Sequence, residues 1–274
     1  MGFFSWLFKR SKPQKRKLGL ALGSGGAKGF AELGALKAFE ENGIEFDIIA
    51  GTSIGSIIGA FYADGYSATD IAELIKSVDF SEIKNLFMMN MDTFGVFKVI
   101  DRTIGSKNIE ELKKPFMTVA TEVESGEEHV FSTGSVAMAL CASSSYPPFF
   151  KPVVIGDYRY VDGAFTNSIP ADLVKEMGAD YIVGIDLSNH EKGKQSLLSR
   201  IIPTYKGKVE EPWKKGYENS DIMLHPDLSA YKPTSIGEAN KMYEIGYECA
   251  IKHIPQILKD IENLSLKKSK KPKK

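Results

Sequence analysis

Apolar and polar residues follow the periods of strands and helices through the first 80 positions of the chain. The short apolar runs 18–22 and 46–49 have the length and composition of buried strands. Stretches with helical spacing follow them, from about 28 to 42 and over 56–62, and another helix is predicted near 68–77. This order of strand, helix, strand, helix predicts a parallel sheet with right-handed crossover connections.

The rest of the chain continues the pattern less regularly. The segment 79–107 shows no clear period, and 188–220 is polar and predicted to be a loop. We predict paired strands over 116–123 and 128–132, helices over 135–142 and 171–177, strands over 181–186 and 222–224, and a last helix over 236–263 that Pro255 breaks. The whole chain is therefore predicted to be α/β, with three layers and a central, mostly parallel sheet.

A glycine-rich loop, 23–29, joins the first predicted strand to the first predicted helix. Glycines in such a loop let backbone N–H groups come close to an anion. The loop lacks the Gly-Lys-Ser/Thr of a nucleoside-triphosphate loop, and Lys28 occupies the last position of a dinucleotide G-x-G-x-x-G pattern. Taken alone, the loop indicates either an anion site or close packing of a helix on a strand.

The sequence G-x-S-x-G lies between the second predicted strand and its helix, with Ser53 at its centre. Gly51 and Gly55 flank this serine. A sharp strand-to-helix turn exposes a serine hydroxyl at the end of a sheet, where it can attack a carbonyl carbon. Combined with the glycine-rich loop, the turn predicts an oxyanion hole made of the N–H groups of Gly25, Gly26 and Ile54.

A nucleophilic serine needs a base, and two choices are open. The run Asp162-Gly163-Ala164 follows a predicted strand and indicates either a simple turn or an acid at the active edge of the sheet. None of the four histidines stands in a catalytic setting, and we interpret them as surface or packed residues. His225 fits a triad best, with Asp186 as its acid.

Charge and cysteine content indicate the compartment and the partners that the protein is expected to have. Twelve basic groups lie within residues 1–17 and 267–274, which leaves 23 basic against 35 acidic groups in the body of the chain. Two cysteines suggest no disulfide framework, so a reducing compartment is expected. No run reaches the ~20 apolar residues of a membrane span. We find no cluster of metal ligands and expect no nucleic-acid partner.

Taken together, these motifs resemble the patatin-like phospholipase family. The resemblance covers about residues 17–190 and rests on Gly25-Gly26-Ala27-Lys28-Gly29, on Gly51-Thr52-Ser53-Ile54-Gly55, on the run from Ala142 to Phe150, and on Asp162-Gly163-Ala164. Ser24 departs from the family pattern, which usually has glycine there, and this puts the outer edge of the oxyanion hole in question.

The resemblance implies a patatin-like fold and a Ser–Asp dyad, with Ser53 as nucleophile and Asp162 as proton acceptor. It also implies lipid acyl esters as substrates, chiefly phospholipids and lysophospholipids, hydrolysed through an acyl-enzyme without metal or cofactor. In the motifs, Lys28, Gly29, Gly51, Gly55 and Gly163 would support the site. Two alternatives remain: an α/β-hydrolase esterase with a Ser53–Asp186–His225 triad, and a non-catalytic lipid-binding module.

The ends of the chain suggest contact with a membrane. We predict an appendage over 1–16, an acyl hydrolase domain over 17–264 and a lysine-rich tail over 265–274. Apolar residues near the start and lysines at both ends would bind an anionic lipid surface weakly. The expected location is cytoplasmic, with peripheral contact at the inner membrane face. A methionine- and phenylalanine-rich segment, 86–97, is either core or a lid.

Overall fold

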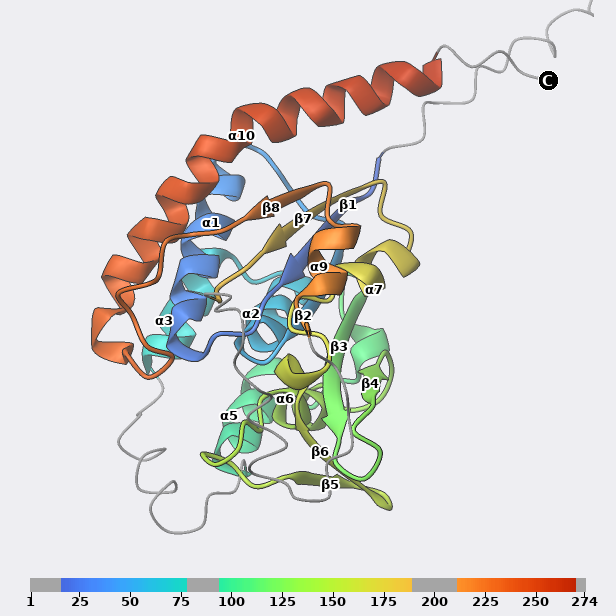
Figure 1. The fold of residues 1–274 in the computed structure, drawn as a ribbon, viewed down its shortest axis with the longest axis vertical. Coiled ribbons are helices and arrows are strands. Elements are labelled where there is room, and N and C mark those ends of the chain that lie inside the picture. The colour runs from blue at the N-terminus through green and yellow to red at the C-terminus, as the bar shows by residue number, and fades with distance from the viewer. Residues whose placement is uncertain (1–15, 78–93, 189–210, 270–274) are drawn as a thin grey trace, which may run out of the picture.

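The strands form one mixed sheet with parallel strands at its centre. The computed structural model describes residues 16–77, 94–188 and 211–269. Within these ranges the sheet has the order β5-β6-β3-β2-β1-β7-β8, with β4 paired to β3 (Figure 1). Its strands are β1 (Leu18–Leu22), β2 (Ile48–Thr52), β3 (Phe116–Glu122), β4 (Glu128–Phe131), β5 (Val153–Ile155), β6 (Tyr158–Asp162), β7 (Tyr181–Ile185) and β8 (Ile222–Leu224).

The parallel and antiparallel parts of the sheet meet at β3. Strands β3, β2, β1, β7 and β8 are parallel in that order, whereas β4 and β6 run antiparallel to β3 and β5 runs antiparallel to β6. The predicted three-layer α/β fold with a mostly parallel sheet is confirmed. The pairing of 116–123 with 128–132 is also confirmed, as β3 and β4.

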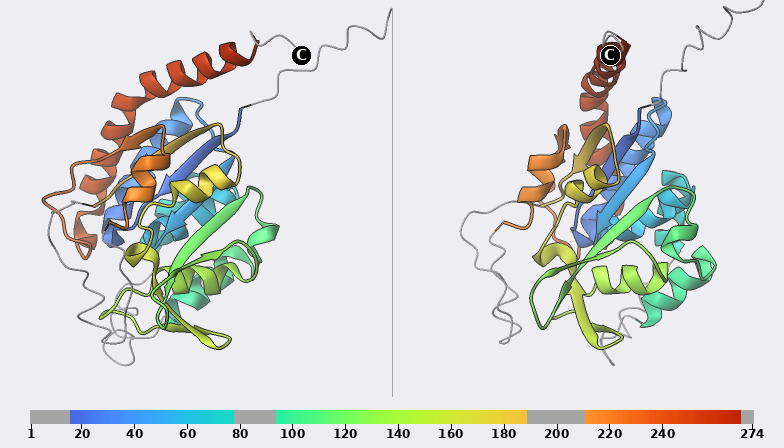
Figure 2. Two further views of the ribbon diagram at one scale, coloured as in Figure 1. Left: turned by 45° about the vertical axis from the view of Figure 1, so that its right-hand side comes forward. Right: turned by 90° about the vertical axis from the view of Figure 1, so that its right-hand side faces the viewer.

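Helices cover both faces of the sheet, as the edge-on view shows (Figure 2). One face carries α1 (Phe30–Glu41), α2 (Ile54–Ala63), α3 (Ala68–Ser77), α5 (Phe94–Ile104), α6 (Val136–Ser143) and α10 (Ala239–Ser269). The other carries α7 (Ala171–Glu176) and α9 (Lys214–Asn219). Alternate residues of the strands supply the two cores: Leu20 packs with the first group of helices, and Ala21 packs with the second.

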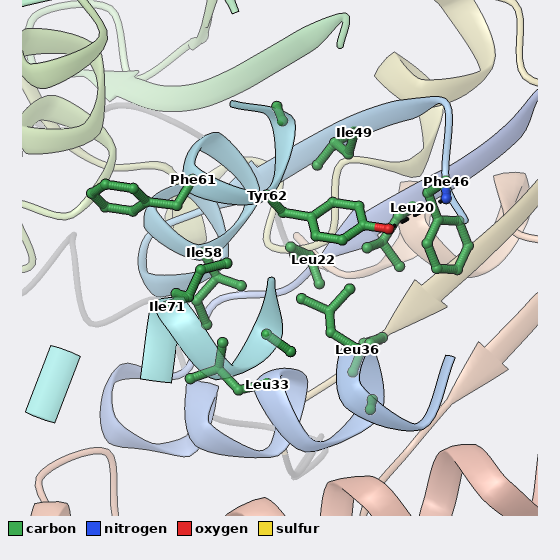
Figure 3. Packing of buried hydrophobic residues seen from close by; sticks show 14 of the residues in the cluster. Leu20, Leu22, Leu33, Leu36, Phe46, Ile49, Ile58, Phe61, Tyr62 and Ile71 are labelled. Carbon is green, nitrogen blue, oxygen red and sulfur yellow. Dashed lines mark hydrogen bonds between the residues drawn. The ribbon is translucent and has the colours of Figure 1, made fainter. Parts of the chain in front are cut away.

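The larger core lies between the sheet and helices α1, α2 and α3. Leu20 and Leu22 of β1 face Leu33 and Leu36 of α1 across this layer (Figure 3). Ile58 of α2 and Ile71 of α3 pack in the same layer and are fully buried. Fully burying a leucine or isoleucine contributes roughly 1.5–3 kcal/mol, so this layer fixes the helices that begin at the glycine-rich loop and at Ser53.

Helix α1 is buried nearly all round because α10 covers its outer side (Figure 1). The two helices touch through glycines. A Cβ on Gly34 would overlap the carbonyl of Tyr243, and one on Gly246 would overlap the carbonyl of Ala31. The C-terminal helix thereby presses against the helix that follows the glycine-rich loop, and its last turns extend beyond the sheet (Figure 1).

Four details differ from the sequence prediction. Helix α5 lies within the segment for which no period was found, and Ile100 and Ile104 bury its inner side. The short strand β5 and helix α9 were not predicted. Helix α10 runs through Pro255 without a break, because the proline is exposed and the carbonyl that loses its partner can be hydrated.

Several predictions concern segments outside the described residues. They include residues 1–15 of the appendage, His190, residues 86–93 of the methionine-rich segment and residues 270–274 of the tail. Helix α10 continues to Ser269, and the domain boundaries stay a prediction. In the described part of the chain, we find no helix with both the length and the apolar character that a membrane crossing requires.

Candidate functional site

Strands β2 and β6 meet end to end along one edge of β3. Val119 and Ala120 of β3 both pair with β4 on one side. On the other side, Val119 pairs with Thr52, the last residue of β2, and Ala120 pairs with Asp162, the last residue of β6. Because β2 is parallel and β6 antiparallel to β3, their carboxyl ends point at each other. This register brings Thr52 and Asp162, which are 110 residues apart in the sequence, close together.

Ser53 occupies the turn between β2 and α2. Its backbone has φ 57° and ψ −125°, a left-handed conformation that is unfavourable for a residue with a Cβ. The flanking glycines leave room for this turn: a Cβ on Gly51 would overlap the backbone of Gly55, and one on Gly55 would lie 2.6 Å from the carbonyl oxygen of Gly23. The strand, turn and helix predicted around G-x-S-x-G are thus present.

The Ser53 hydroxyl donates a hydrogen bond to Asp162. The distance from Ser53 Oγ to Asp162 Oδ2 is 2.6 Å, and Oδ1 accepts the N–H of Ala164 at 2.8 Å. Gly163 lets the chain pass close to β3, since a Cβ there would overlap the carbonyl of Val119. The two residues of the predicted dyad are therefore in direct contact.

Asp162 is only 1% exposed, and this burial controls its charge. Burial raises the pKa of its carboxyl to about 7, while the hydrogen bonds from Ser53 and Ala164 act in the opposite direction. A carboxyl with a pKa near neutrality can both take and return a proton at physiological pH. Geometry and proton affinity at this position both suit a general base.

The glycine-rich loop runs beside the turn that holds Ser53. A Cβ on Gly29 would overlap the side chain of Ile54, the first residue of α2. Gly26 has φ 58° and lies against Pro233, whose carbonyl accepts the N–H of Ala27 at 2.7 Å. The loop therefore contacts the start of α2 through Gly29. Gly25 and Gly26 of this loop and Ile54 of α2 are the residues predicted to form the oxyanion hole.

The side chain of Lys28 is buried rather than exposed to solvent. It is 7% exposed, and its Nζ lies 3.4 Å from the carbonyl oxygen of Leu187. Burial lowers the pKa of its ammonium group, and the nearby Asp186 carboxylate opposes this change. Lys28 therefore connects the loop to the segment that follows β7, and its supporting role in the motif stays a prediction.

Glu32, on α1, also anchors the loop and was missed by the sequence analysis. Its Oε1 accepts the N–H of Gly23 at 2.7 Å, and the residue is fully buried. Its other oxygen has no hydrogen-bond partner among the described residues. Burial raises the pKa of this carboxyl well above its ordinary value. The sequence does hold one sign of this role, since Glu32 is an acidic residue among the apolar positions of α1.

The pair proposed for the alternative triad exists, but Ser53 is bonded elsewhere. His225 Nδ1 lies 3.3 Å from Asp186 Oδ2, and Asp186 also accepts hydrogen bonds from Ser188 and Tyr217. Asp186 directly follows β7, two strands away from β2 in the sheet order. The Ser53 hydroxyl is directed at Asp162, so the geometry favours the dyad over the triad.

Two other histidines contact neighbouring residues of the fold, in agreement with their interpretation as packed or surface residues. His129 lies between Phe131 and Tyr160, with ring centroids 4.5 and 4.8 Å away, and burial lowers its pKa. His253, within α10, has its Nδ1 2.7 Å from the carbonyl oxygen of Cys249. Both rings pack locally and make no contact with Ser53.

Comparison with known proteins assigns the chain to a family. The family model described as patatin-like phospholipase matches residues 20–175, which include Ser53 and Asp162. The chain belongs to the patatin-like phospholipase family. The resemblance stated from its motifs is thereby confirmed.

Individual relatives cover most of this chain but are much longer than it. Patatin-like phospholipase domain-containing protein 6 of Mus musculus is 28% identical over 273 residues, covering 84% of this chain and 20% of the mouse protein. Neuropathy target esterase sws of Drosophila melanogaster is 30% identical over 189 residues, covering 64% of this chain and 13% of the fly protein. This chain thus spans about a fifth of the length of the mouse relative.

A solved structure shares the fold. VipD from Legionella pneumophila superposes with a TM-score of 0.53 and 14% sequence identity, covering 90% of this chain and 68% of VipD. At this level of identity the similarity concerns the fold alone.

Proposed function

We propose that this protein is a lipid acyl hydrolase in which Ser53 and Asp162 form the catalytic dyad. The observation that carries the proposal is the 2.6 Å hydrogen bond from the Ser53 hydroxyl to a buried carboxylate whose pKa is about 7. The strained turn at Ser53 and the neighbouring glycine-rich loop support the same assignment. Family membership supports acyl-ester lipids as the substrate class.

The first half of the reaction acylates Ser53. The hydroxyl oxygen attacks the ester carbonyl carbon while its proton passes to Asp162 Oδ2. The carbonyl oxygen becomes negatively charged, and the N–H groups of Gly25, Gly26 and Ile54 are the proposed donors that stabilise it. The tetrahedral intermediate then breaks its bond to the leaving alcohol, which takes the proton from Asp162.

The second half of the reaction restores the enzyme. Water attacks the acyl-enzyme and gives a proton to Asp162, which forms a second tetrahedral intermediate. When the bond from the acyl carbon to Ser53 Oγ breaks, the proton returns to Ser53 and the fatty acid is released. Each cycle therefore consumes one ester and one water, and Asp162 ends in its initial ionised state.

Phospholipids and lysophospholipids are the proposed substrates. The mouse relative is named a patatin-like phospholipase and the fly relative an esterase, and both names fit hydrolysis of a lipid carboxylic ester. We propose a cytoplasmic enzyme that contacts anionic membrane surfaces peripherally through residues 1–17 and 267–274. Co-sedimentation with phosphatidylglycerol vesicles tests this contact, and unchanged binding after deletion of residues 1–16 would contradict the part assigned to the N-terminal segment.

Labelling with a fluorophosphonate probe tests the dyad directly. Such a probe reacts with an activated serine, and mass spectrometry locates the adduct. We expect an adduct on Ser53 in the wild type, no adduct in Ser53→Ala, and a labelling rate reduced by several orders of magnitude in Asp162→Asn. An unlabelled but folded wild type would favour the lipid-binding alternative instead.

A further inference from the structure

Two serines of the run 142–150 contact the backbones of the proposed dyad. The hydroxyl of Ser143 accepts the N–H of Ser53 at 2.9 Å. The backbone carbonyl of Ser145 accepts the N–H of Asp162 at 3.0 Å. The run was noted above only as part of the family resemblance, and these contacts connect the end of α6 to both reacting residues.

Ser143 belongs to a group of buried hydroxyls at the end of β2. Its Oγ lies 3.0 Å from Oγ1 of Thr118, and this threonine donates to the carbonyl oxygen of Gly51 at 2.9 Å. Ser143 and Thr118 are both fully buried. The hydroxyls therefore connect the N–H of Ser53 to the carbonyl of Gly51, so the two peptide groups on either side of Thr52 are held by the same pair of side chains.

The contact with Ser143 matters because Ser53 has a left-handed backbone. A residue with a Cβ stays at φ 57° only when its surroundings hold it there. Without the Ser143 hydroxyl, a buried N–H at the turn would lose its acceptor, and the peptide between Thr52 and Ser53 could rotate. That rotation would move Oγ relative to Asp162 and relative to the N–H of Ile54.

We propose that Ser143 is a positioning residue that holds the nucleophile in its reactive geometry through the backbone of Ser53. This inference rests on the proposed function, since it assigns a part in the same acylation reaction. Ser143 accepts the Ser53 N–H, and the N–H of the next residue, Ile54, is one of the proposed oxyanion donors. The hydroxyl of Thr118 is hydrogen-bonded to that of Ser143 and helps to fix its position.

The test compares Ser143→Ala with a matched control, Ser144→Ala. The two variants remove the same atom from neighbouring residues, but the Ser144 hydroxyl is buried without a hydrogen-bond partner among the described residues. We expect Ser143→Ala to lower the rate of fluorophosphonate labelling by about 10- to 100-fold, because small displacements of a reacting atom have effects of this order. Ser144→Ala should stay within about twofold of the wild type.

A pH profile separates positioning from a general loss of structure. Ser143 contacts the backbone of Ser53 and not the carboxyl of Asp162, so Ser143→Ala should lower the plateau of the labelling rate and leave its midpoint pH unchanged. Thr118→Val keeps the shape of the side chain and removes its hydroxyl. It should slow labelling about threefold or more without unfolding the protein, which provides a second measurement if Ser143→Ala does not fold.

The outcomes distinguish this inference from the proposed function. If the wild type is labelled on Ser53 and Ser143→Ala or Thr118→Val reacts equally fast, the positioning role is wrong and the dyad stands. If Ser143→Ala and Ser144→Ala slow labelling equally, or the midpoint pH moves with the plateau, Ser143 has a structural role only. A folded wild type without any label overturns the dyad and the positioning role together.

Discussion

Gly55 packs directly on the backbone of Gly23, so the turn at Ser53 and the glycine-rich loop are in contact without any side chain between them. A Cβ on Gly55 would lie 2.6 Å from the carbonyl oxygens of both Gly23 and Leu22. The Leu22 oxygen belongs to the last residue of β1 and the Gly23 oxygen to the start of the loop, so α2 packs directly on the end of this strand. The start of the loop that is proposed to bind the oxyanion therefore packs against the helix that follows the nucleophile.

Replacing Gly55 by alanine should damage both stability and reactivity. The added methyl group must push the loop away from α2, and overpacking of this kind typically costs about 1–3 kcal/mol. We expect a lower urea midpoint together with slower fluorophosphonate labelling of Ser53. Gly237→Ala is the control, because a Cβ there meets no atom within 4 Å. Equal behaviour of the two variants would contradict the close packing.

The rate of acylation should rise with pH and level off above pH 7. In the proposed reaction Asp162 accepts the proton of Ser53 only when its carboxyl is ionised, and burial raises the pKa of this carboxyl to about 7. Below that value the rate should fall about tenfold for each pH unit. Labelling rates measured from pH 5.5 to 8.5 check this, and a flat profile over that range would exclude Asp162 as the base.

The stability of the fold should fall as pH rises, whereas the rate of acylation rises. The pKa of Asp162 is raised from 3.8 to about 7 on folding, so the folded state loses stability as pH rises through this interval. The shift corresponds to roughly 4 kcal/mol at pH 8. Asp162→Asn should therefore be more stable than the wild type at pH 8, with the difference vanishing near pH 4. The exposed Asp157→Asn serves as a control for charge removal in urea unfolding.

Variants of Glu32 should separate its hydrogen bond from its charge. Glu32→Gln keeps an oxygen for the N–H of Gly23 and removes a carboxyl whose raised pKa makes the fold less stable as pH rises above the ordinary range of carboxyls. We expect it to be as stable as the wild type at pH 5 and more stable at pH 8. Glu32→Ala leaves the Gly23 N–H without this acceptor and should lose about 1–3 kcal/mol. Thermal unfolding at both pH values checks these expectations.

Replacing His225 by glutamine should leave the labelling of Ser53 within about twofold of the wild type. The histidine faces Asp186, whereas the serine is hydrogen-bonded to Asp162. In a triad the same change would lower the rate by roughly 10³-fold or more. The midpoint of the pH profile should also stay unchanged in this variant. A large loss of rate in a folded His225→Gln protein would restore the triad.

Local sequence patterns predicted most elements because each is encoded by a few neighbouring residues. The apolar runs of β1 and β7 are short and bounded by turns, and Ser53 lies in a motif whose glycines have a direct steric purpose. Helix α5 was missed although Ile100 and Ile104 have helical spacing, because methionines and phenylalanines upstream obscured its period.

The contacts within the site depend on pairing between distant strands, which no local pattern encodes. Asp162 reaches Ser53 because β6 continues the edge of β3 that β2 leaves at Thr52. Ser143 and Glu32 contact backbone N–H groups, and such contacts depend on the fold rather than on a motif. The proposed reacting groups could therefore be predicted from local motifs, whereas the residues that contact their backbones could not.

Two features described above oppose folding, and this has a consequence for how the sequence changes over generations. Ser53 carries an unfavourable backbone conformation that glycine would adopt freely, and Asp162 is a buried carboxyl whose ionisation opposes folding, a cost that asparagine would lack. Under mutation without selection for chemistry, glycine at 53 and asparagine at 162 would be accepted readily, because each removes a feature that opposes folding. The serine and the aspartate would persist together only in a lineage that still uses them.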